Sequence, residues 1–233
     1  MAEFKFSGST LKIYYFIGRL NPPHSGHIGA LKAMITAANA DGSEPLILLG
    51  SGPNGGERTM DNPVPFETKE QFLRYILPGL TFTVRRITNQ VADVVQWYTD
   101  VLTHVPTPHA VEFIRFAGNK DDNATKLSFI DTSLKKLGPN VTAGTVAIPP
   151  IESNSGAEEM SATIVRQHAY RCYLADKGGG GFRDFRERFG HFYGDYCGQV
   201  YKDIVFPVLD LPDADVVSYI ETKKLPKKSR SRK

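Results

Sequence analysis

Two histidines separated by two residues stand in the segment Gly18–His27, GRLNPPHSGH. The apolar run Lys12–Gly18 leads into this segment and predicts a buried strand, and Ile28–Asn39 repeats apolar side chains with the spacing of a helix. A helix that begins at about Ile28 would offer free N–H groups and the positive end of its dipole to an anion. Gly26 would allow close approach of the backbone. Imidazole rings, Arg19 and a helix N-terminus at one point suit a phosphoryl group.

His24 and His27 have two other interpretations, a structural turn and a zinc site. Zinc would need further ligands, and the only cysteines, Cys172 and Cys197, are distant in sequence. A predicted strand on one side and a predicted helix on the other place the histidines at the usual ligand edge of an open α/β sheet. This context favours binding of a nucleotide phosphate over both alternatives.

The segment GRLNPPHSGH resembles the HxGH signature of the nucleotidyltransferase superfamily. This group includes nicotinamide-mononucleotide adenylyltransferases, phosphopantetheine adenylyltransferases and cytidylyltransferases. A second segment, EMSATIVR at Glu159–Arg166, is similar to the ISxTxxR motif of the same superfamily, with Ser161, Thr163 and Arg166 in register. It follows a predicted strand and opens a predicted helix, with Ser161 as a plausible N-cap. Two motifs in the family's order make an ordinary capped helix a less attractive interpretation.

Softer similarities lie between and after these motifs. NPVPFETK at Asn62–Lys69 resembles a stretch of some members, including nucleotidyltransferases encoded by large phages, and Lys69 is interpreted equally as a phosphate contact or a solvated surface lysine. AGNKDD at Ala117–Asp122 is similar to the family segment near the ribose and base, or is a polar turn before the next helix. GGFRDFRERFG at Gly180–Gly190 is also similar to a segment of the phage group.

The resemblance implies transfer of a nucleoside monophosphate, most simply AMP from ATP, to a phosphate-bearing acceptor with release of pyrophosphate. It implies that His24, His27 and Arg166 act on the phosphates, and that Mg²⁺ accompanies the triphosphate, held mainly by phosphate oxygens and water. The other nucleotide contacts that it implies are Gly18, Arg19, Asn21, Gly26, Gly118, Lys120, Asp121, Ser161 and Thr163.

The acceptor that the motifs favour is nicotinamide mononucleotide, with NAD as the product. Two departures keep other acceptors open: Gly118–Leu137 contains no Trp, and Leu20 stands where Phe is common in such enzymes. A cytidylyltransferase that makes a CDP-alcohol is one alternative. A non-catalytic nucleotide-binding protein of the same fold is another, although such a protein has no physical need to keep both motifs intact.

Apolar runs alternate with stretches of helical periodicity along most of the chain. Strands are predicted at 12–18, 45–49, 81–86, 111–117 and 141–148, and helices at 28–39, 66–77, 91–105 and 126–137. Three more helices are predicted at 161–176, 182–189 and 193–205. The predicted fold class is α/β, a Rossmann-like doubly wound parallel sheet of about five strands with a C-terminal helical extension.

The composition excludes several classes of protein. Hydrophobic residues make up 41% of the 233 residues, enough for a sizeable core. No apolar run approaches the ~20 residues that span a bilayer, so we expect no membrane partner. The first residues lack the basic start and apolar stretch of a secretory signal. Only two cysteines occur, which suits a reducing compartment, here the cytoplasm, or the host cytoplasm if the protein is viral.

The net charge of +3 is unevenly distributed. Residues 223–233 contain seven Lys or Arg residues and no acid, so the rest of the chain is net acidic. We interpret this tail as a solvated, disordered end, and we expect no nucleic-acid partner except through it. The predicted organisation is a core over 1–160, a C-terminal helical part of the same domain over 161–222 and the tail over 223–233. Nothing in the sequence indicates an oligomeric state.

Overall fold

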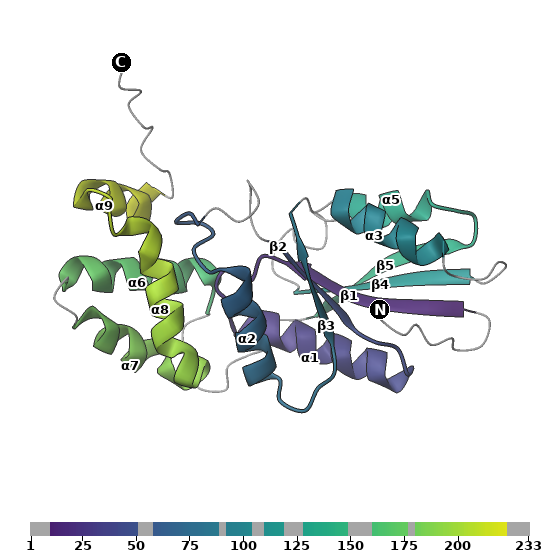
Figure 1. Ribbon diagram of the computed structural model, residues 1–233, viewed down its shortest axis with the longest axis horizontal. Coiled ribbons are helices and arrows are strands. Elements are labelled where there is room, and N and C mark those ends of the chain that lie inside the picture. The colour runs from purple at the N-terminus through teal and green to yellow at the C-terminus, as the bar shows by residue number, and fades with distance from the viewer. Residues whose placement is uncertain are drawn as a thin grey trace, which may run out of the picture.

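Five parallel strands form one sheet in the order β3-β2-β1-β4-β5 (Figure 1). The computed structural model describes residues 10–50, 58–88, 92–103, 110–118, 128–148, 160–176 and 180–222. The strands are β1 Thr10–Gly18, β2 Leu46–Gly50, β3 Thr83–Ile87, β4 Ala110–Gly118 and β5 Val141–Ile148. The strand order reverses between β1 and β4, which is where open α/β sheets bind their ligands. The predicted Rossmann-like α/β fold is confirmed.

Two pairs of helices cover opposite faces of the sheet (Figure 1). Helices α1 (Ser25–Ala40) and α2 (Phe66–Ile76) lie on one face, and α3 (Ala92–Thr103) and α5 (Ser128–Lys135) lie on the other. Strand β1 separates two hydrophobic cores because successive side chains of a strand point to opposite faces. Tyr14 and Phe16 join the core beneath α1, whereas Ile13, Tyr15 and Ile17 join the core beneath α3 and α5.

The C-terminal third adds four helices beside the carboxyl ends of the strands. They are α6 (Ala162–Ala175), α7 (Gly181–Tyr193), α8 (Cys197–Val205) and α9 (Asp213–Thr222), with 3₁₀ turns at Gly194–Tyr196 and Phe206–Val208. Their buried residues belong to the same core as α1 and α2. Helix α9 is absent from the sequence-based assignment. It packs against α6 through Val216, Tyr219 and Ile220.

None of the described helices combines the length and the apolarity needed to cross a bilayer. Several predictions fall outside the part of the chain that the structure describes. Lys120 and Asp121, Glu159 at the start of the second motif, and the basic tail 223–233 belong to this group.

Candidate functional site

The turn between β1 and α1 carries the histidine motif at the carboxyl edge of the sheet. Leu20 is buried with a positive φ of 47°, so the chain bends sharply directly after β1. The helix begins at Ser25 with His24 as its N-cap, earlier than the predicted start near Ile28, because the N–H of Ile28 already bonds to the carbonyl of His24 at 3.1 Å. The N–H groups of the first helical turn have no carbonyl acceptor within the helix, and in α1 they belong to residues of the histidine motif.

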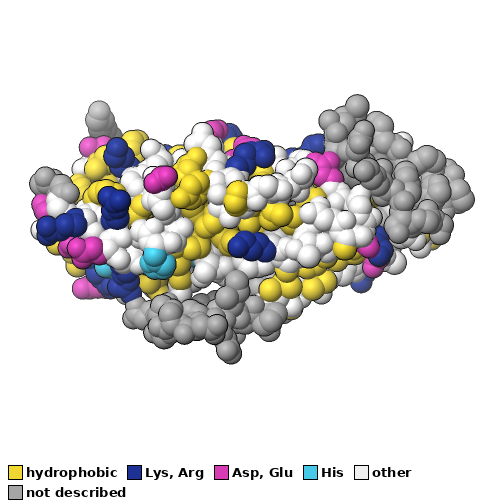
Figure 2. Space-filling view, turned by 90° about the horizontal axis from the view of Figure 1, so that it is seen from below, with side chains coloured by type: hydrophobic (Ala, Val, Ile, Leu, Met, Phe, Trp, Pro, Cys, Tyr) yellow, Lys and Arg dark blue, Asp and Glu magenta, His cyan; other side chains and the backbone are white. Residues whose placement is uncertain are grey.

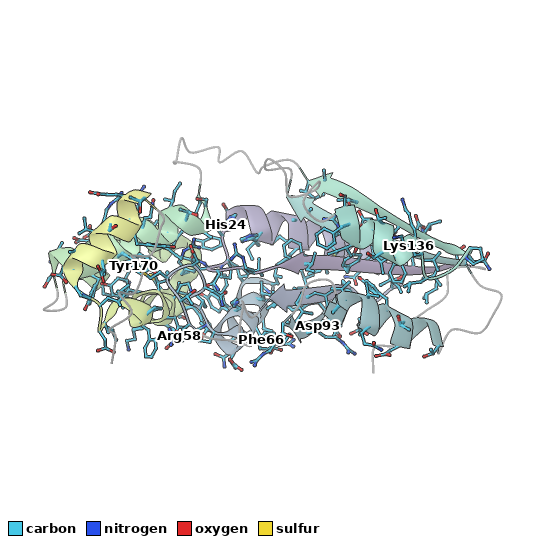
Figure 3. All side chains as sticks on the ribbon, turned by 90° about the horizontal axis from the view of Figure 1, so that it is seen from above. His24, Arg58, Phe66, Asp93, Lys136 and Tyr170 are labelled. Atoms are coloured by element: carbon cyan, nitrogen blue, oxygen red, sulfur yellow. The ribbon has the colours of Figure 1, made fainter. Side chains whose placement is uncertain are left out.

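The two imidazole rings lie against each other, with ring centroids 3.7 Å apart and planes inclined by 39°. Figure 3 shows His24 where the sheet meets the C-terminal helices. His27 also meets the edge of Phe16, at a centroid distance of 6.3 Å. Its Nδ1 atom is buried, and no described residue hydrogen-bonds to it. Burial, and to a lesser extent the neighbouring His24, hold the pKa of His27 well below its usual value, so the ring is uncharged at neutral pH.

Because Gly26 has no side chain, the His24 ring can lie close to its Cα atom. A Cβ atom added at Gly26 would lie 3.2 Å from Cε1 and 3.3 Å from Nδ1 of His24. These distances are shorter than ordinary van der Waals contacts, so any larger residue would displace the ring. Glycine is therefore required at this position because a side chain would collide with the His24 ring.

The substitution Gly26→Ala tests the steric role of Gly26 separately from any effect on the stability of the fold. Alanine favours helix over glycine by up to about 1 kcal/mol, so the midpoint of thermal unfolding should stay unchanged or rise. On the expectation from the motif that ATP binds here, the displaced His24 ring should at the same time weaken that binding several-fold, measured by titration calorimetry. Gly144→Ala is the matched control, because a Cβ there meets nothing within 4 Å. Equal ATP affinity in both variants would contradict this role of Gly26.

Three buried side chains from three helices fasten the backbone of the β1–α1 turn. The turn contains two consecutive prolines, Pro22 and Pro23, which have no N–H groups to offer its carbonyls. The donors come from elsewhere: Lys69 Nζ to the carbonyl of Arg19 (2.9 Å), Arg166 Nη1 to that of Asn21, and the Tyr193 hydroxyl to that of Pro23 (2.7 Å). We call Lys69, Arg166 and Tyr193 the carbonyl clamp.

Asn21 adds a side-chain connection to the loop before α2. Its Oδ1 accepts a hydrogen bond from the N–H of Val64 at 2.8 Å, and its Nδ2 donates to Oδ1 of Asn62. Asn21 is buried, with an exposed fraction of 4%. Its side chain therefore ties the turn to the loop.

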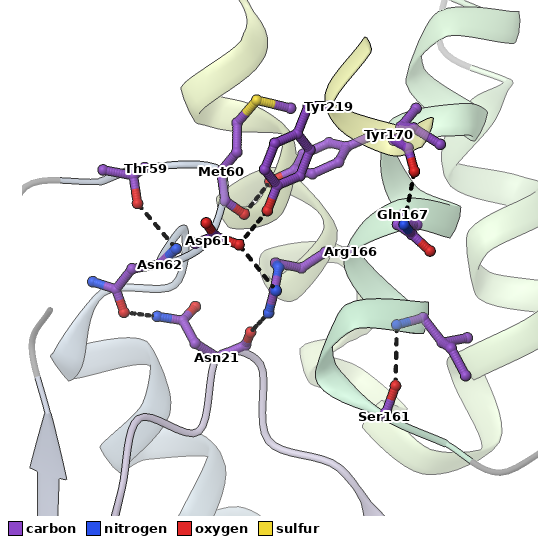
Figure 4. A network of polar contacts seen from close by, with 12 residues as sticks. Asn21, Thr59, Met60, Asp61, Asn62, Ser161, Arg166, Gln167, Tyr170 and Tyr219 are labelled. Carbon is purple, nitrogen blue, oxygen red and sulfur yellow. Dashed lines mark hydrogen bonds and ion pairs between the residues drawn. The ribbon is translucent and has the colours of Figure 1, made fainter. Parts of the chain in front are cut away.

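The second motif lies at the start of α6, as predicted. Ser161 is the N-cap, and its Oγ accepts a hydrogen bond from the N–H of Ile164 at 3.3 Å. Thr163 lies in the first turn, and Arg166 lies one turn further along and is 8% exposed. Figure 4 shows that the Arg166 guanidinium reaches from α6 to the β1–α1 turn. Two segments far apart in sequence are thus joined by the contact of Arg166 with the carbonyl of Asn21.

A carboxylate that the sequence reasoning missed also contacts Arg166. Asp61 Oδ1 lies 3.4 Å from Nη2 of Arg166 and accepts a hydrogen bond from the hydroxyl of Tyr219 on α9 (Figure 4). The Asp61 side chain is 54% exposed. With Thr163 and Gln167, these three residues line a cavity of about 40 Å³. Asp61 directly precedes the NPVPFETK segment, but only the tertiary fold brings it to Arg166.

Lys69 is neither on the surface nor solvated, so that interpretation is wrong. The residue is fully buried on α2, on the same helix face as Phe72 and Leu73. Desolvation, and then the charges of Arg19 and Arg86, lower the pKa of Lys69 to about 8. The spacing of Lys69, Phe72, Leu73 and Ile76 on one face could have indicated this burial.

The remaining predicted contacts lie around the same edge of the sheet. Gly18 ends β1, where a Cβ would come within 2.7 Å of Phe16 Cε1, and the side chain of Arg19 is exposed beyond it. Gly118 ends β4, on the other side of the point where the strand order reverses, and a Cβ there would meet nothing within 4 Å. Open space therefore lies at the end of β4 among the described residues.

Comparison with models of known protein families finds no match for this chain, and a search of curated proteins finds no relative. Within the described part of the chain, no group of three or more His, Cys, Asp or Glu side chains could hold a metal ion. The geometry of the turn, the histidine pair and the carbonyl clamp is therefore what indicates a function.

Proposed function

We propose that this protein is a nucleotidyltransferase that transfers a nucleoside monophosphate, most simply AMP from ATP, to a phosphate-bearing acceptor and releases pyrophosphate. The observation that carries the proposal is the contact of Arg166 with the carbonyl of Asn21. This contact joins the start of α6 to the histidine turn at the reversal point of the sheet. The two segments that resemble the superfamily motifs thus meet at one edge of the sheet. Segments that resembled the motifs only by chance would have no reason to meet in the fold.

The turn offers the groups that an anionic phosphate needs. Free N–H groups at the start of α1 and the positive end of its dipole attract anions. The buried Nδ1 of His27 has no partner among the described residues, and a buried polar atom without a partner is uncommon unless a ligand uses it. A phosphate oxygen that accepts a hydrogen bond from Nδ1 would give this atom its partner.

The proposed chemistry needs no protein nucleophile and no strong base. The acceptor phosphate is already an anion at pH 7, and attack on the α-phosphorus breaks its bond to the bridging oxygen of the leaving pyrophosphate. The protein then contributes positioning and stabilisation of the developing charge. In this scheme His24 and His27 hold the α- and β-phosphates, and Arg166 with Ser161 and Thr163 holds the β- and γ-phosphates.

Mg²⁺ enters the proposal only as the counter-ion of the triphosphate. It would neutralise charge on the phosphate oxygens and complete its coordination with water, as this hard cation usually does with phosphate substrates. The described residues fit this arrangement, because the site offers cationic and N–H donors and lacks a cluster of three potential metal ligands. The residues of the turn and the clamp would bind the phosphates themselves.

Nicotinamide mononucleotide is the acceptor that we propose, with NAD as product. Figure 2 supports a small-molecule substrate over a nucleic acid on the face that it shows, because positive and negative side chains alternate over the C-terminal helices. A surface that binds nucleic acid presents a stripe of one sign.

The direct test is release of pyrophosphate from ATP, CTP, GTP and UTP, each with nicotinamide mononucleotide, phosphocholine or phosphopantetheine. We expect release with ATP and nicotinamide mononucleotide, and release about 10²–10³-fold slower by the His27→Ala protein, which controls for contaminating enzymes. Release only with CTP and phosphocholine would replace the adenylyltransferase by a cytidylyltransferase. Nucleotide binding without release for any pair would contradict a catalytic function.

A further inference from the structure

Lys69 connects the ends of two neighbouring strands through their main chain. Its Nζ donates to the carbonyl of Arg19, directly after β1, at 2.9 Å, and to that of Gly50, the last residue of β2, at 3.1 Å. The ammonium is fully buried. Both acceptors are backbone groups, so the side chain is engaged with the framework of the site.

The charges that face Lys69 make this burial costly. Arg19 from the β1–α1 turn and Arg86 from β3 are the cations that oppose it, and Glu67 on its own helix is the carboxylate that favours it. Glu67, however, is largely exposed and accepts a hydrogen bond from Arg86. The neighbouring carboxylate is thus shared with another cation, and two carbonyl dipoles provide the close compensation. A buried ammonium held in this way would be an expensive means of packing α2 alone.

We propose that Lys69 is a positioning residue, whose ammonium fixes the ends of β1 and β2 and thereby holds the histidine turn in the arrangement that receives a phosphate. This inference rests on the proposed function for the identity of the anion. It differs from a direct phosphate contact, because Lys69 acts through the carbonyl of Arg19. The ammonium also places positive charge beneath an edge at which strand carbonyls would otherwise repel an anion.

The role predicts that anion binding is coupled to protonation of Lys69. Near pH 8 about half of the Lys69 side chains carry the proton, because the pKa lies at about 8. A bound anion raises that pKa, so binding should take up protons, approaching about half a proton per site at this pH. His27 cannot supply this signal near pH 8, because its pKa lies well below 6.5 and the ring stays neutral.

The experiment is calorimetric titration with ATP, without acceptor, near pH 8 in Tris and in HEPES, whose ionisation enthalpies differ. The wild type should take up a measurable fraction of a proton. Lys69→Met, which keeps the length of the side chain without its charge, should lose that uptake and bind ATP about tenfold more weakly. Lys135→Met, an exposed lysine on the opposite face of the sheet, should behave as the wild type. Equal uptake in the wild type and Lys69→Met would overturn the coupling.

A ligand-free measurement tests positioning in the wild type alone, even if Lys69→Met fails to fold. Amide hydrogen exchange at Ile28 and Val64, whose N–H groups bond to His24 and Asn21 of the turn, should lose protection, after correction for intrinsic rates, between about pH 7 and pH 9.5 as the ammonium deprotonates. Unchanged protection would overturn the positioning role, whether or not ATP binds. Loss of protection in a protein that binds no ATP would support the positioning role and refute only the proposed nucleotidyltransferase function.

Discussion

Replacing His27 with alanine is expected to lower turnover by about 10²–10³-fold, the usual effect of removing one preorganised donor from a charged transition state. The ring is held against His24 and Phe16 at the start of α1, so its donor is oriented before substrate binds. Pyrophosphate release by the purified variant, with ATP and acceptor at saturation, measures the effect. His191→Ala, at an exposed position on α7, is the control.

The same variant should change how acid affects stability. The pKa of His27 lies below its unfolded value of about 6.5, so unfolding takes up a proton in the interval between the two values. The free energy of unfolding is therefore expected to fall as the pH drops below about 6.5. Urea unfolding of His27→Ala should show a weaker loss over that interval. Full turnover in a folded His27→Ala protein would refute the catalytic assignment, and an unchanged acid profile would refute the burial argument.

Replacing Arg166 with alanine is expected to weaken binding of the triphosphate by about ten- to a hundredfold. A hydrogen bond to a charged group contributes about 1.5–3 kcal/mol, which corresponds to this range. The guanidinium has two functions in the structure, since Nη1 holds the carbonyl of Asn21 and Nη2 faces the exposed carboxylate of Asp61. Both the ATP affinity and the free energy of unfolding should therefore decrease.

Two further variants separate these functions of Arg166. Arg166→Lys keeps the charge and a single donor but loses the fork that serves two acceptors, so its ATP affinity should be intermediate. Arg171→Ala removes an exposed arginine from the same helix and should change neither quantity. An unaltered KM for ATP in Arg166→Ala would remove Arg166 from triphosphate binding and leave it with the clamp alone.

The sheet was predictable because its strands are local signals. Strands β1 and β2 are apolar runs, helical periodicity alternates with the strands along the chain, and the five described strands overlap the five predicted ones. The N-cap Ser161 was predictable for the same reason, since its hydrogen bond lies within one helical turn. Local pattern thus placed Ser161 correctly at the start of α6, whereas α1 begins at Ser25 and not near Ile28 as predicted.

The contacts that arrange the site were not predictable, because they join residues far apart in the chain. Nothing near Pro23 indicates Tyr193 as its donor, and Asp61 meets Arg166 only after α6 and α9 have packed. Helix α9 was missed although Pro212 and the acidic first turn, Asp213 and Asp215, are ordinary signals of a helix start. The helix is only 10 residues long, a length that is marginal in isolation, and it packs on α6.

The carbonyl clamp has a consequence for the order in which the protein is made. The histidine turn leaves the ribosome before Arg166 and Tyr193, which fasten it, have been synthesised. Because chains emerge from the N-terminus, the nascent sheet can form before the turn is fastened. A nascent chain would therefore complete the proposed phosphate site only after helices α6 and α7 have been synthesised and have docked.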